Sequence, residues 1–472
     1  IGGRGGGESR PRCCLCVYPP VRMKGNVEDR WADRVITVVF VALIIDLLGF
    51  TLILPLLPSL LDHYGSVEQG GLHQMLQEGV DWFADTVGIP EHERHNSVLF
   101  GGLIGSLFSL LQFVSSPLFG AASDRYGRRS MMLLSMVLIL ASYGIWAVSH
   151  SFGLFLVSRA LGGASKANIS LSTAIIADLP LHKRSKGMAF VGAAFSIGFM
   201  FGPPLGAALA GTGSHGALFF MPALLAAAFA ASDIVFLALL LPETLPPARR
   251  VPSVLSGIKG SSHLFNPVAL FRFSAVQETG REAPHKDVVS LRRLGVIYFL
   301  YIFLYSGLEY NLGFLTHTRF NFTRMQQGKM LFAVGVAMVI IQGGYVRRLS
   351  PGREMAVVQR ALLLLIPAFI LIGWAPTLPV LYVGLLLYAF ASATVVPCLT
   401  TAVASYGSPS QKGVLMGILR SLGSLARALG PVLAASAFWG TGARVCFTTG
   451  AFLFLLPVLL LCGLRPSAKK SN

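Results

Sequence analysis

Residues 120–129 read Gly120-Ala-Ala-Ser-Asp124-Arg125-Tyr-Gly127-Arg128-Arg129, a polar stretch between two long apolar runs. The runs cover residues 97–121 and 130–149, and each is long enough to cross a bilayer, which takes about 20 apolar residues. The glycines at either side of the aspartate permit a tight reversal of the chain. The stretch therefore predicts a short polar loop that joins two antiparallel membrane helices.

Apolar runs of this kind recur along the whole chain. Of its 472 residues, 54% are hydrophobic and 12% are charged, whereas a soluble domain carries about 25% charged residues. This composition excludes a soluble globular protein, a disordered protein and a small disulfide-stapled one. We count twelve predicted spans, at residues 35–61, 97–121, 130–149, 152–177, 187–210, 217–241, 294–315, 328–346, 356–374, 379–404, 413–438 and 445–464.

Long polar segments divide these spans into two groups of six. The longest is a basic linker between the sixth and the seventh span, and a further polar loop follows the first span. We therefore expect five parts: a disordered cytosolic tail (1–34), an N-terminal six-helix bundle (35–241), a cytosolic basic linker (242–293), a C-terminal six-helix bundle (294–464) and a cytosolic tail (465–472).

An internal repeat relates the two bundles. Gly202-Pro203 in the fifth span recurs as Gly430-Pro431 in the eleventh, 228 residues later. Parallel repeats of six helices are typical of transporters whose site lies between the halves, near the middle of the membrane. The sequence thus predicts an all-α membrane protein with twelve transmembrane helices in two pseudo-symmetric six-helix bundles.

The net charge of +17 comes from 38 basic and 21 acidic residues. A nucleic-acid-binding protein would gather its cations on one polar face, but here they lie between apolar runs, so no nucleic-acid partner is expected. By our count 29 of the cations fall on one side of the spans and five on the other, which predicts that both termini are cytosolic. The lipid bilayer is the expected partner. The sequence does not decide between the plasma membrane and an internal membrane such as the nuclear envelope.

A glycosylation acceptor follows from this orientation. Asn321-Phe-Thr323 has the acceptor pattern and falls in a loop on the side opposite the termini, where it is expected to be modified. Asn168-Ile-Ser170 has the same pattern but lies inside the fourth span, so we expect it to remain unmodified.

The stretch at 120–129 resembles the cytosolic signature of the major facilitator superfamily, because its Gly, Asp, Arg, Gly and two further Arg all stand in register. The resemblance implies that Asp124 meets the start of the eleventh helix, where the helix dipole favours a negative charge. It also implies that Asp178 is the acidic partner of the loop arginines. The implied gate consists of Gly120, Asp124, Arg125, Gly127, Arg128, Arg129 and Asp178.

Three further regions carry the resemblance. Residues 46–61 of the first span are similar to the first helix of bacterial tetracycline:proton antiporters. The runs at 96–106, 241–245 and 306–310 resemble the vertebrate tetracycline-transporter-like branch, whose implied cargo is organic anions. The fifth span is similar to the glycine-proline signature of the family's antiporters, through Gly198, Gly202, Pro203 and Gly206.

Seven charged residues lie inside the predicted spans, and each costs about 2.5–3.5 kcal/mol at the centre of a membrane helix. They are Asp46, Arg159, Lys166, Asp233, Glu309, Arg420 and Arg427. Two pairs of these cations have members seven residues apart, Arg159 with Lys166 and Arg420 with Arg427. Seven residues is close to two helical turns, so the two members of each pair share one helix face. The excess of cations over carboxylates favours an anionic ligand. We predict substrate binding by Lys166, Arg427, Arg159 and Arg420, and proton transfer by Asp46 and Glu309.

The predicted function is secondary active transport of a small amphipathic organic anion by alternating access, with proton coupling left open. One alternative is a multidrug or tetracycline-like proton antiporter that exports its substrate. A second is a receptor or scaffold that transports nothing, which would leave the buried charges unexplained. We expect no enzyme, no cofactor and no metal site, because the histidines of the loop at 62–96 have no ligand spacing and no nucleophile stands beside a base.

Overall fold

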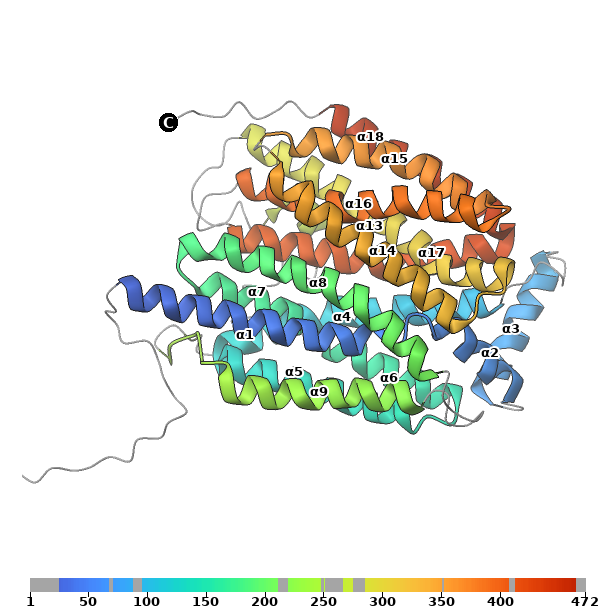
Figure 1. The fold of residues 1–472 in the computed structure, drawn as a ribbon, viewed down its shortest axis with the longest axis horizontal. Helices are drawn as coiled ribbons and strands as arrows, with labels where there is room; N and C mark the ends of the chain where they lie inside the picture. Colours follow the sequence, from blue (N-terminus) through green and yellow to red (C-terminus); the bar gives the residue numbers. More distant parts are fainter. Residues whose placement is uncertain are drawn as a thin grey trace, which may run out of the picture.

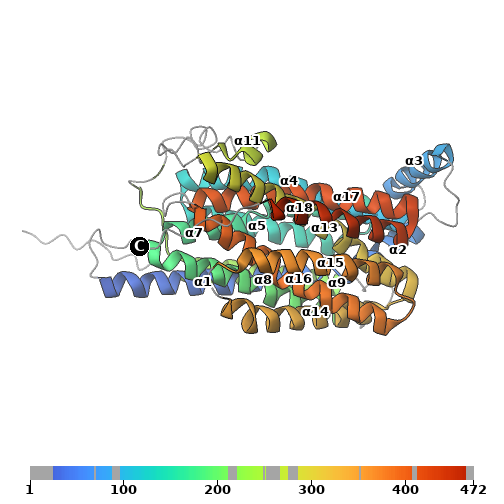
Figure 2. The same cartoon turned by 90° about the horizontal axis from the view of Figure 1, so that it is seen from above.

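The computed structural model describes residues 25–67, 71–87, 96–210, 220–247, 250, 266–274, 285–349, 352–406 and 412–463. Within these ranges the chain is helical and contains no strand, and most helices run along one elongated bundle (Figures 1 and 2). The predicted all-α membrane fold is therefore confirmed. The predicted tail up to residue 24, most of the basic linker, and the C-terminal tail lie outside the described residues.

The N-terminal bundle opens with a bent first span. Turns at 52–56, which include Pro55, separate its two parts, since proline cannot continue the hydrogen bonding of a helix. The helices are α1 (Gly25–Thr51), α2 (Leu57–Val67), α3 (Leu72–Val87), α4 (Asn96–Tyr126), α5 (Arg128–Ala147), α6 (Phe152–Ser165), α7 (Asn168–Asp178), α8 (Leu181–Ala210) and α9 (Phe220–Leu240).

Helix α1 begins earlier than the span predicted from residue 35, at Gly25. Its polar first turns are held on α8 by Asp33, whose carboxylate oxygens lie 2.9 Å from the Nζ atoms of Lys183 and Lys186. Residues 25–34 are therefore part of a helix, and the predicted disordered tail is wrong for this segment.

The C-terminal bundle follows a linker of which the short helix α11 (Pro267–Arg272) is described. Asn266 caps α11 by accepting a hydrogen bond from the backbone N–H of Val268 at 3.0 Å. The remaining helices are α13 (His285–Phe320), α14 (Arg324–Gly344), η4 (Val346–Arg348), α15 (Glu354–Trp374), α16 (Leu378–Tyr406), α17 (Lys412–Leu453) and α18 (Leu455–Cys462).

The count of membrane spans agrees with the predicted twelve. Ten helical stretches among the described residues are long and apolar enough to cross a membrane. One of them, Val414–Cys462, contains the eleventh and twelfth spans, because the chain turns at Gly442, where φ is 77°. The fourth span is divided into α6 and α7, each too short to be counted alone.

The two bundles meet closely at one end. We call this the outer end, after the orientation that the sequence predicts; it carries α2 and α3, and α1 begins at the opposite, inner end (Figures 1 and 2). A Cβ atom added to Gly102 of α4 would lie 2.3 Å from Ala435 Cβ of α17, so only glycine fits there without movement. Nearby, Trp439 Nε1 donates to Asn96 Oδ1 at 2.9 Å. These contacts close the outer end.

A polar pair adds to this closure, and we call Asp62 and His317 the outer latch. His317 Nε2 of α13 lies 3.0 Å from Asp62 Oδ2 of α2, so the latch joins the two bundles. Burial raises the pKa of Asp62, but hydrogen bonds from His317 and Ser97 outweigh it, and the pKa lies below its ordinary value. The closed outer end therefore stabilises the ionised carboxylate.

Candidate functional site

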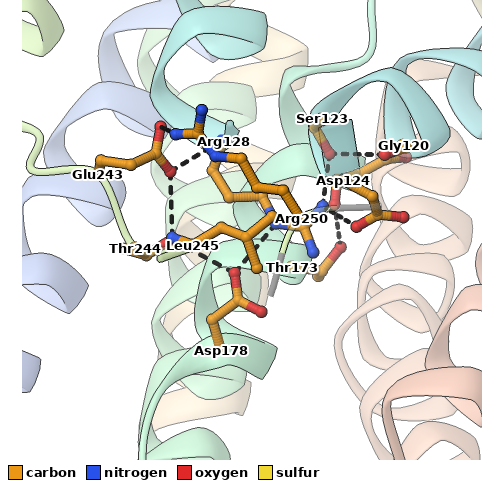
Figure 3. Close-up of polar contacts among 11 residues, drawn as sticks. Gly120, Ser123, Asp124, Arg128, Thr173, Asp178, Glu243, Thr244, Leu245 and Arg250 are labelled. Carbon is orange, nitrogen blue, oxygen red and sulfur yellow. Dashed lines mark hydrogen bonds and ion pairs between the residues drawn. The ribbon is translucent and has the colours of Figure 1, made fainter. Parts of the chain in front are cut away.

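A cluster of charged groups surrounds the junction between α4 and α5 (Figure 3). Helix α4 ends at Tyr126 and α5 begins at Arg128, so Gly127 alone makes the reversal. Its φ of 100° lies in the left-handed region, which glycine adopts without steric cost. Gly120 lies inside α4 and takes no part in the turn, which differs from the reversal predicted from both glycines.

Arg128 lies at the centre of this cluster (Figure 3). Its Nη1 lies 2.7 Å from Asp124 Oδ1, and its Nε donates to Asp178 Oδ2 at 3.0 Å. Nη1 also donates to Ser123 Oγ at 2.5 Å. Because the Arg128 side chain is buried, these charge-assisted hydrogen bonds offset the cost of removing its charge from water. One guanidinium thus ties α4, α5 and α7 together.

The other two loop arginines make separate contacts. The guanidinium of Arg125 lies 5.6 Å from the ring centroid of its neighbour Tyr126. Arg129 Nη2 donates to the carbonyl oxygen of Ala238 on α9 at 2.5 Å. Asp178 therefore contacts Arg128, and Arg129 reaches the backbone of α9.

Glu243, just beyond α9, completes the cluster, although the sequence analysis did not propose it as a site residue. It accepts hydrogen bonds from the backbone N–H of Arg128 at 2.9 Å and of Leu245 at 3.1 Å. Arg250 Nη2 lies 3.7 Å from its second oxygen. A Cβ atom on Gly127 would lie 2.2 Å from that oxygen, so a larger residue there would displace the Glu243 carboxylate. The first residues of the linker are thereby anchored on the α4–α5 turn (Figure 3).

A second charged group lies inside the N-terminal bundle. Lys166 Nζ lies 2.6 Å from Asp46 Oδ1 and 2.7 Å from Oδ2, and both residues are 3% exposed. Asn168 Nδ2 also donates to Oδ2. The Lys166 ammonium further faces the Phe50 ring, 4.8 Å from its centroid. A predicted substrate-binding residue and a predicted proton carrier thus form one buried ion pair, which we call the central pair.

The central pair depends on a break in the fourth span. Helix α6 ends at Ser165 and α7 begins at Asn168, so the carbonyls at the break lose their helical partners. Side chains of neighbouring helices replace them: Ser135 Oγ donates to Ser165 O at 2.6 Å, and Gln112 Nε2 donates to Lys166 O at 3.1 Å. Within a membrane such replacement is required, because water is absent. The break lets Lys166 reach Asp46.

A third carboxylate lies close to the central pair. Asp233 of α9 is 1% exposed and lies within electrostatic reach of both Asp46 and Lys166. In the described part of the chain its Oδ1 atom has no hydrogen-bond partner. The N-terminal bundle therefore holds two buried carboxylates near one ammonium.

The C-terminal bundle holds its carboxylate in a different way. Tyr388 of α16 donates its hydroxyl hydrogen to Glu309 Oε1 at 2.6 Å, and the Tyr305 hydroxyl lies 3.2 Å from the same oxygen. The two phenol rings are stacked, with centroids 5.2 Å apart. Ser392 Oγ lies 2.6 Å from the Tyr305 hydroxyl. Glu309 is thus surrounded by hydroxyl groups, none of which the sequence analysis singled out.

Comparison with known proteins agrees with this architecture. The family model described as Major Facilitator Superfamily matches residues 39–431. The chain belongs to this superfamily. It is therefore a membrane transporter rather than an enzyme, as the sequence predicts.

Three relatives resemble this transporter over nearly its whole length. Major facilitator superfamily domain-containing protein 10 from Homo sapiens is 55% identical over 464 residues, 98% of this chain and 97% of the relative. The same protein from Mus musculus is 55% identical over 455 residues, 96% and 97% of the two chains. The crystal structure of the human organic anion transporter MFSD10 (TETRAN) has a TM-score of 0.77 at 57% sequence identity, and the match covers 91% of this chain and 99% of that chain.

The glycine-proline stretch of this transporter lies where α8 packs against α1. A Cβ atom added to Gly198 would lie 2.5 Å from Leu47 Cβ, and one added to Gly206 would lie 2.1 Å from the Leu52 carbonyl oxygen. At Gly202 the added atom would lie 1.8 Å from Thr51 Oγ1. Pro203 lies inside α8, beside these glycines. The small residues let α8 approach α1 next to the bend that follows Thr51.

The remaining buried cations occupy different surroundings. Arg159 of α6 is 5% exposed, and its guanidinium lies 5.0 Å from the Trp146 ring and 5.5 Å from the Phe155 ring. Arg420 and Arg427 of α17 are half-buried, and among the described residues neither forms an ion pair. Arg427 lies within electrostatic reach of Glu309. The predicted substrate-binding cations thus occupy three separate environments, and of the four, Lys166 is the one that forms an ion pair among the described residues.

Two further sequence predictions remain predictions. The residues at 407–411, which lead into α17, lie outside the described residues, so the expected contact between Asp124 and that helix start is not described. Asn321 is exposed in the turn between α13 and α14, with a φ of 51°, a conformation that asparagine tolerates. In the described ranges no group of three metal-ligating side chains is found.

Proposed function

We propose that this transporter carries a small organic anion across the membrane by alternating access, and that the central pair couples the anion to a proton. The observation that carries the proposal is the Lys166 ammonium, which is buried at a helix break and, among the described residues, forms its ion pair with Asp46. Further support comes from a relative: the human protein with 57% identity is described as an organic anion transporter.

The coupling follows from competition for one ammonium. While Asp46 is ionised it occupies Lys166 with both carboxylate oxygens, at 2.6 and 2.7 Å. A proton that binds Asp46 removes this charge and leaves Lys166 buried without a counter-ion, which is energetically costly. The carboxylate of an incoming anion then takes the place of Asp46. Proton and anion therefore bind together and are released together.

The C-terminal bundle would supply the second half of the site. Arg427 and Arg420 stand on α17, which packs against α4 of the other bundle at the outer end, as the contact at Gly102 indicates. An anion held between Lys166 and Arg427 would connect the two bundles in an occluded state. Glu309 lies within electrostatic reach of Arg427, and the hydroxyl groups around it would then determine whether its carboxylate is ionised.

Reconstituted vesicles test this proposal directly. Uptake of a panel of radiolabelled aromatic and aliphatic carboxylates is measured with and without an inward proton gradient. We expect concentrative, gradient-dependent uptake by the parent and a loss of at least about tenfold in Lys166→Gln, because a charged hydrogen bond contributes about 1.5–3 kcal/mol. Lys329→Gln removes an exposed cation outside the site and is the matched control.

Asp46→Asn separates coupling from binding. The amide keeps the shape of the carboxylate but removes its charge and its proton, so we expect anion exchange to persist while the proton gradient no longer accelerates uptake. Uptake by Lys166→Gln that equals that of the parent would contradict the proposed site. Gradient-dependent uptake by Asp46→Asn would contradict the coupling.

One observation favours a second candidate function, export of a cationic drug in exchange for protons. Asp233 presents a buried carboxylate oxygen that has no partner in the described part of the chain, and such an oxygen would attract a cation. This candidate predicts that a lipophilic cation such as ethidium is expelled from vesicles. It also predicts that Asp233→Asn, and not Lys166→Gln, abolishes the activity.

A further inference from the structure

A cavity of about 460 Å³ opens at the outer end of the C-terminal bundle. It lies where α13 ends and where α17 turns at Gly442, away from the central pair and from Glu309. Its walls include Thr318, Arg319, Phe438, Thr441, Gly442 and Arg444. No carboxylate is among its described lining residues, so the two arginines determine its charge.

The end of α15 holds both arginines in place. Arg319 Nη1 donates to the carbonyl oxygen of Gly373 at 2.6 Å, which leaves the other N–H groups of its guanidinium available. The guanidinium of Arg444 lies 5.3 Å from the ring centroid of Trp374, the last residue of α15. The two guanidinium groups lie within electrostatic reach of each other. Like charges fixed near one cavity favour the binding of an anion.

Trp374 indicates the level of the membrane surface at this cavity. Its side chain is 54% exposed, and its Nε1 donates to Thr448 Oγ1 at 2.8 Å. Exposed tryptophans are enriched at the depth of the lipid headgroups, where one side of the ring is apolar and the other meets water. Such a tryptophan beside the cavity favours a position at the depth where phosphate groups of lipids are concentrated.

From these contacts we infer that the cavity is a binding site for a phosphate group, supplied by a lipid headgroup of the outer leaflet. The planar guanidinium groups of Arg319 and Arg444 match the geometry of a phosphate, which accepts paired hydrogen bonds from arginine. The bound phosphate would connect the end of α13 with the turn between the eleventh and twelfth spans. Since α13 also carries Glu309 and His317, the lipid would act on the helix that contributes to both the outer latch and the interior of the C-terminal bundle.

Lipid binding to the purified full-length chain tests this inference. The protein in neutral detergent is titrated with phosphatidylglycerol, and binding is measured by native mass spectrometry and by the shift in thermal unfolding midpoint. Diacylglycerol, which lacks the phosphate, is the lipid control, and inorganic phosphate at constant ionic strength is the soluble probe. We expect phosphatidylglycerol to bind and to raise the midpoint, and the other two to have little effect.

Substitutions then identify the site. Arg444→Gln is expected to weaken phosphatidylglycerol binding about tenfold, because a charge-assisted contact is lost. Arg319→Lys keeps the charge and tests whether the planar group matters; it is expected to bind more weakly than the parent but better than Arg319→Gln. Lys329→Gln, an exposed cation outside the cavity, should bind like the parent.

Two results would overturn the inference. Unchanged phosphatidylglycerol binding by the Arg319→Gln, Arg444→Gln double variant would show that the lipid binds elsewhere. Equal stabilisation by inorganic phosphate would show that the cavity takes soluble anions and that the lipid is not its source. Neither readout involves transport, so this test is independent of the cargo and of proton coupling.

Discussion

The central pair makes a quantitative prediction about stability. Removing one member leaves the other charged and buried, and such a loss costs about 3–5 kcal/mol in proteins. The geometry places this pair at the upper part of the range, because both carboxylate oxygens contact the ammonium and both side chains are almost fully buried. We therefore expect Asp46→Asn and Lys166→Gln each to lower the free energy of unfolding by about 4–5 kcal/mol.

The double variant of Asp46 and Lys166 tests whether these two residues stabilise the protein through their interaction with each other or independently. With both charges removed, no unpaired charge remains, so Asp46→Asn with Lys166→Gln should be more stable than the sum of the two single effects predicts, by about 1–3 kcal/mol. Unfolding in mixed micelles with increasing sodium dodecyl sulfate, followed by near-ultraviolet circular dichroism, measures all four proteins. Strictly additive effects would refute the reasoning, and so would a single variant as stable as the parent.

Three shorter predictions concern other parts of the transporter. Gly202→Ala should lower the free energy of unfolding by about 1–3 kcal/mol, because the added atom would overlap with Thr51 in the α1–α8 contact. Gly192→Ala on the same helix places its methyl group in open space and should be neutral in the same unfolding assay. A glycosidase should shift the mobility of the cell-expressed protein but not that of Asn321→Gln; a shift that persists would contradict the assigned orientation. The pKa of Asp62 is lowered and that of His317 is raised, so the outer latch stabilises the closed outer end fully between about pH 4 and about pH 6.5, the ordinary pKa values of the two side chains. This contribution is lost as the pH falls through the lowered pKa of Asp62, and also as the pH rises through the raised pKa of His317. The accessibility of a cysteine introduced at the outer end should therefore rise in acid, and His317→Gln should abolish that rise.

The spans were predictable because length and hydropathy decide them. A run of about 20 apolar residues has few alternatives to a membrane helix, so the boundaries of α9 and α15 lie within a few residues of the predicted ones. The break between α6 and α7 was not predictable in this way, because both pieces are apolar. It depends on hydrogen bonds from Ser135 and Gln112, which come from other helices.

The candidate site was predictable in its members and not in its pairings. Asp46 and Lys166 were identified because charge is costly in a membrane, but no local pattern relates two residues 120 positions apart. Tyr388 attracted no attention, because a tyrosine in an apolar run ordinarily serves packing. Glu243 stood in a recognised run of residues, yet its contact with Arg128 depends on how α9 returns beside α5.

The break in the fourth span also has a consequence for biogenesis. A polypeptide that enters the membrane during synthesis exposes each new segment before its later neighbours exist. Lys166 enters as part of the fourth span, when Asp46 of the first span is already inserted, and the helices that carry Ser135 and Gln112 have also been made. The ammonium therefore finds its counter-ion, and the broken backbone its donors, without any residue of the second bundle. Co-translational assembly of the first six helices can therefore form the complete central pair while the ribosome is still synthesising the linker.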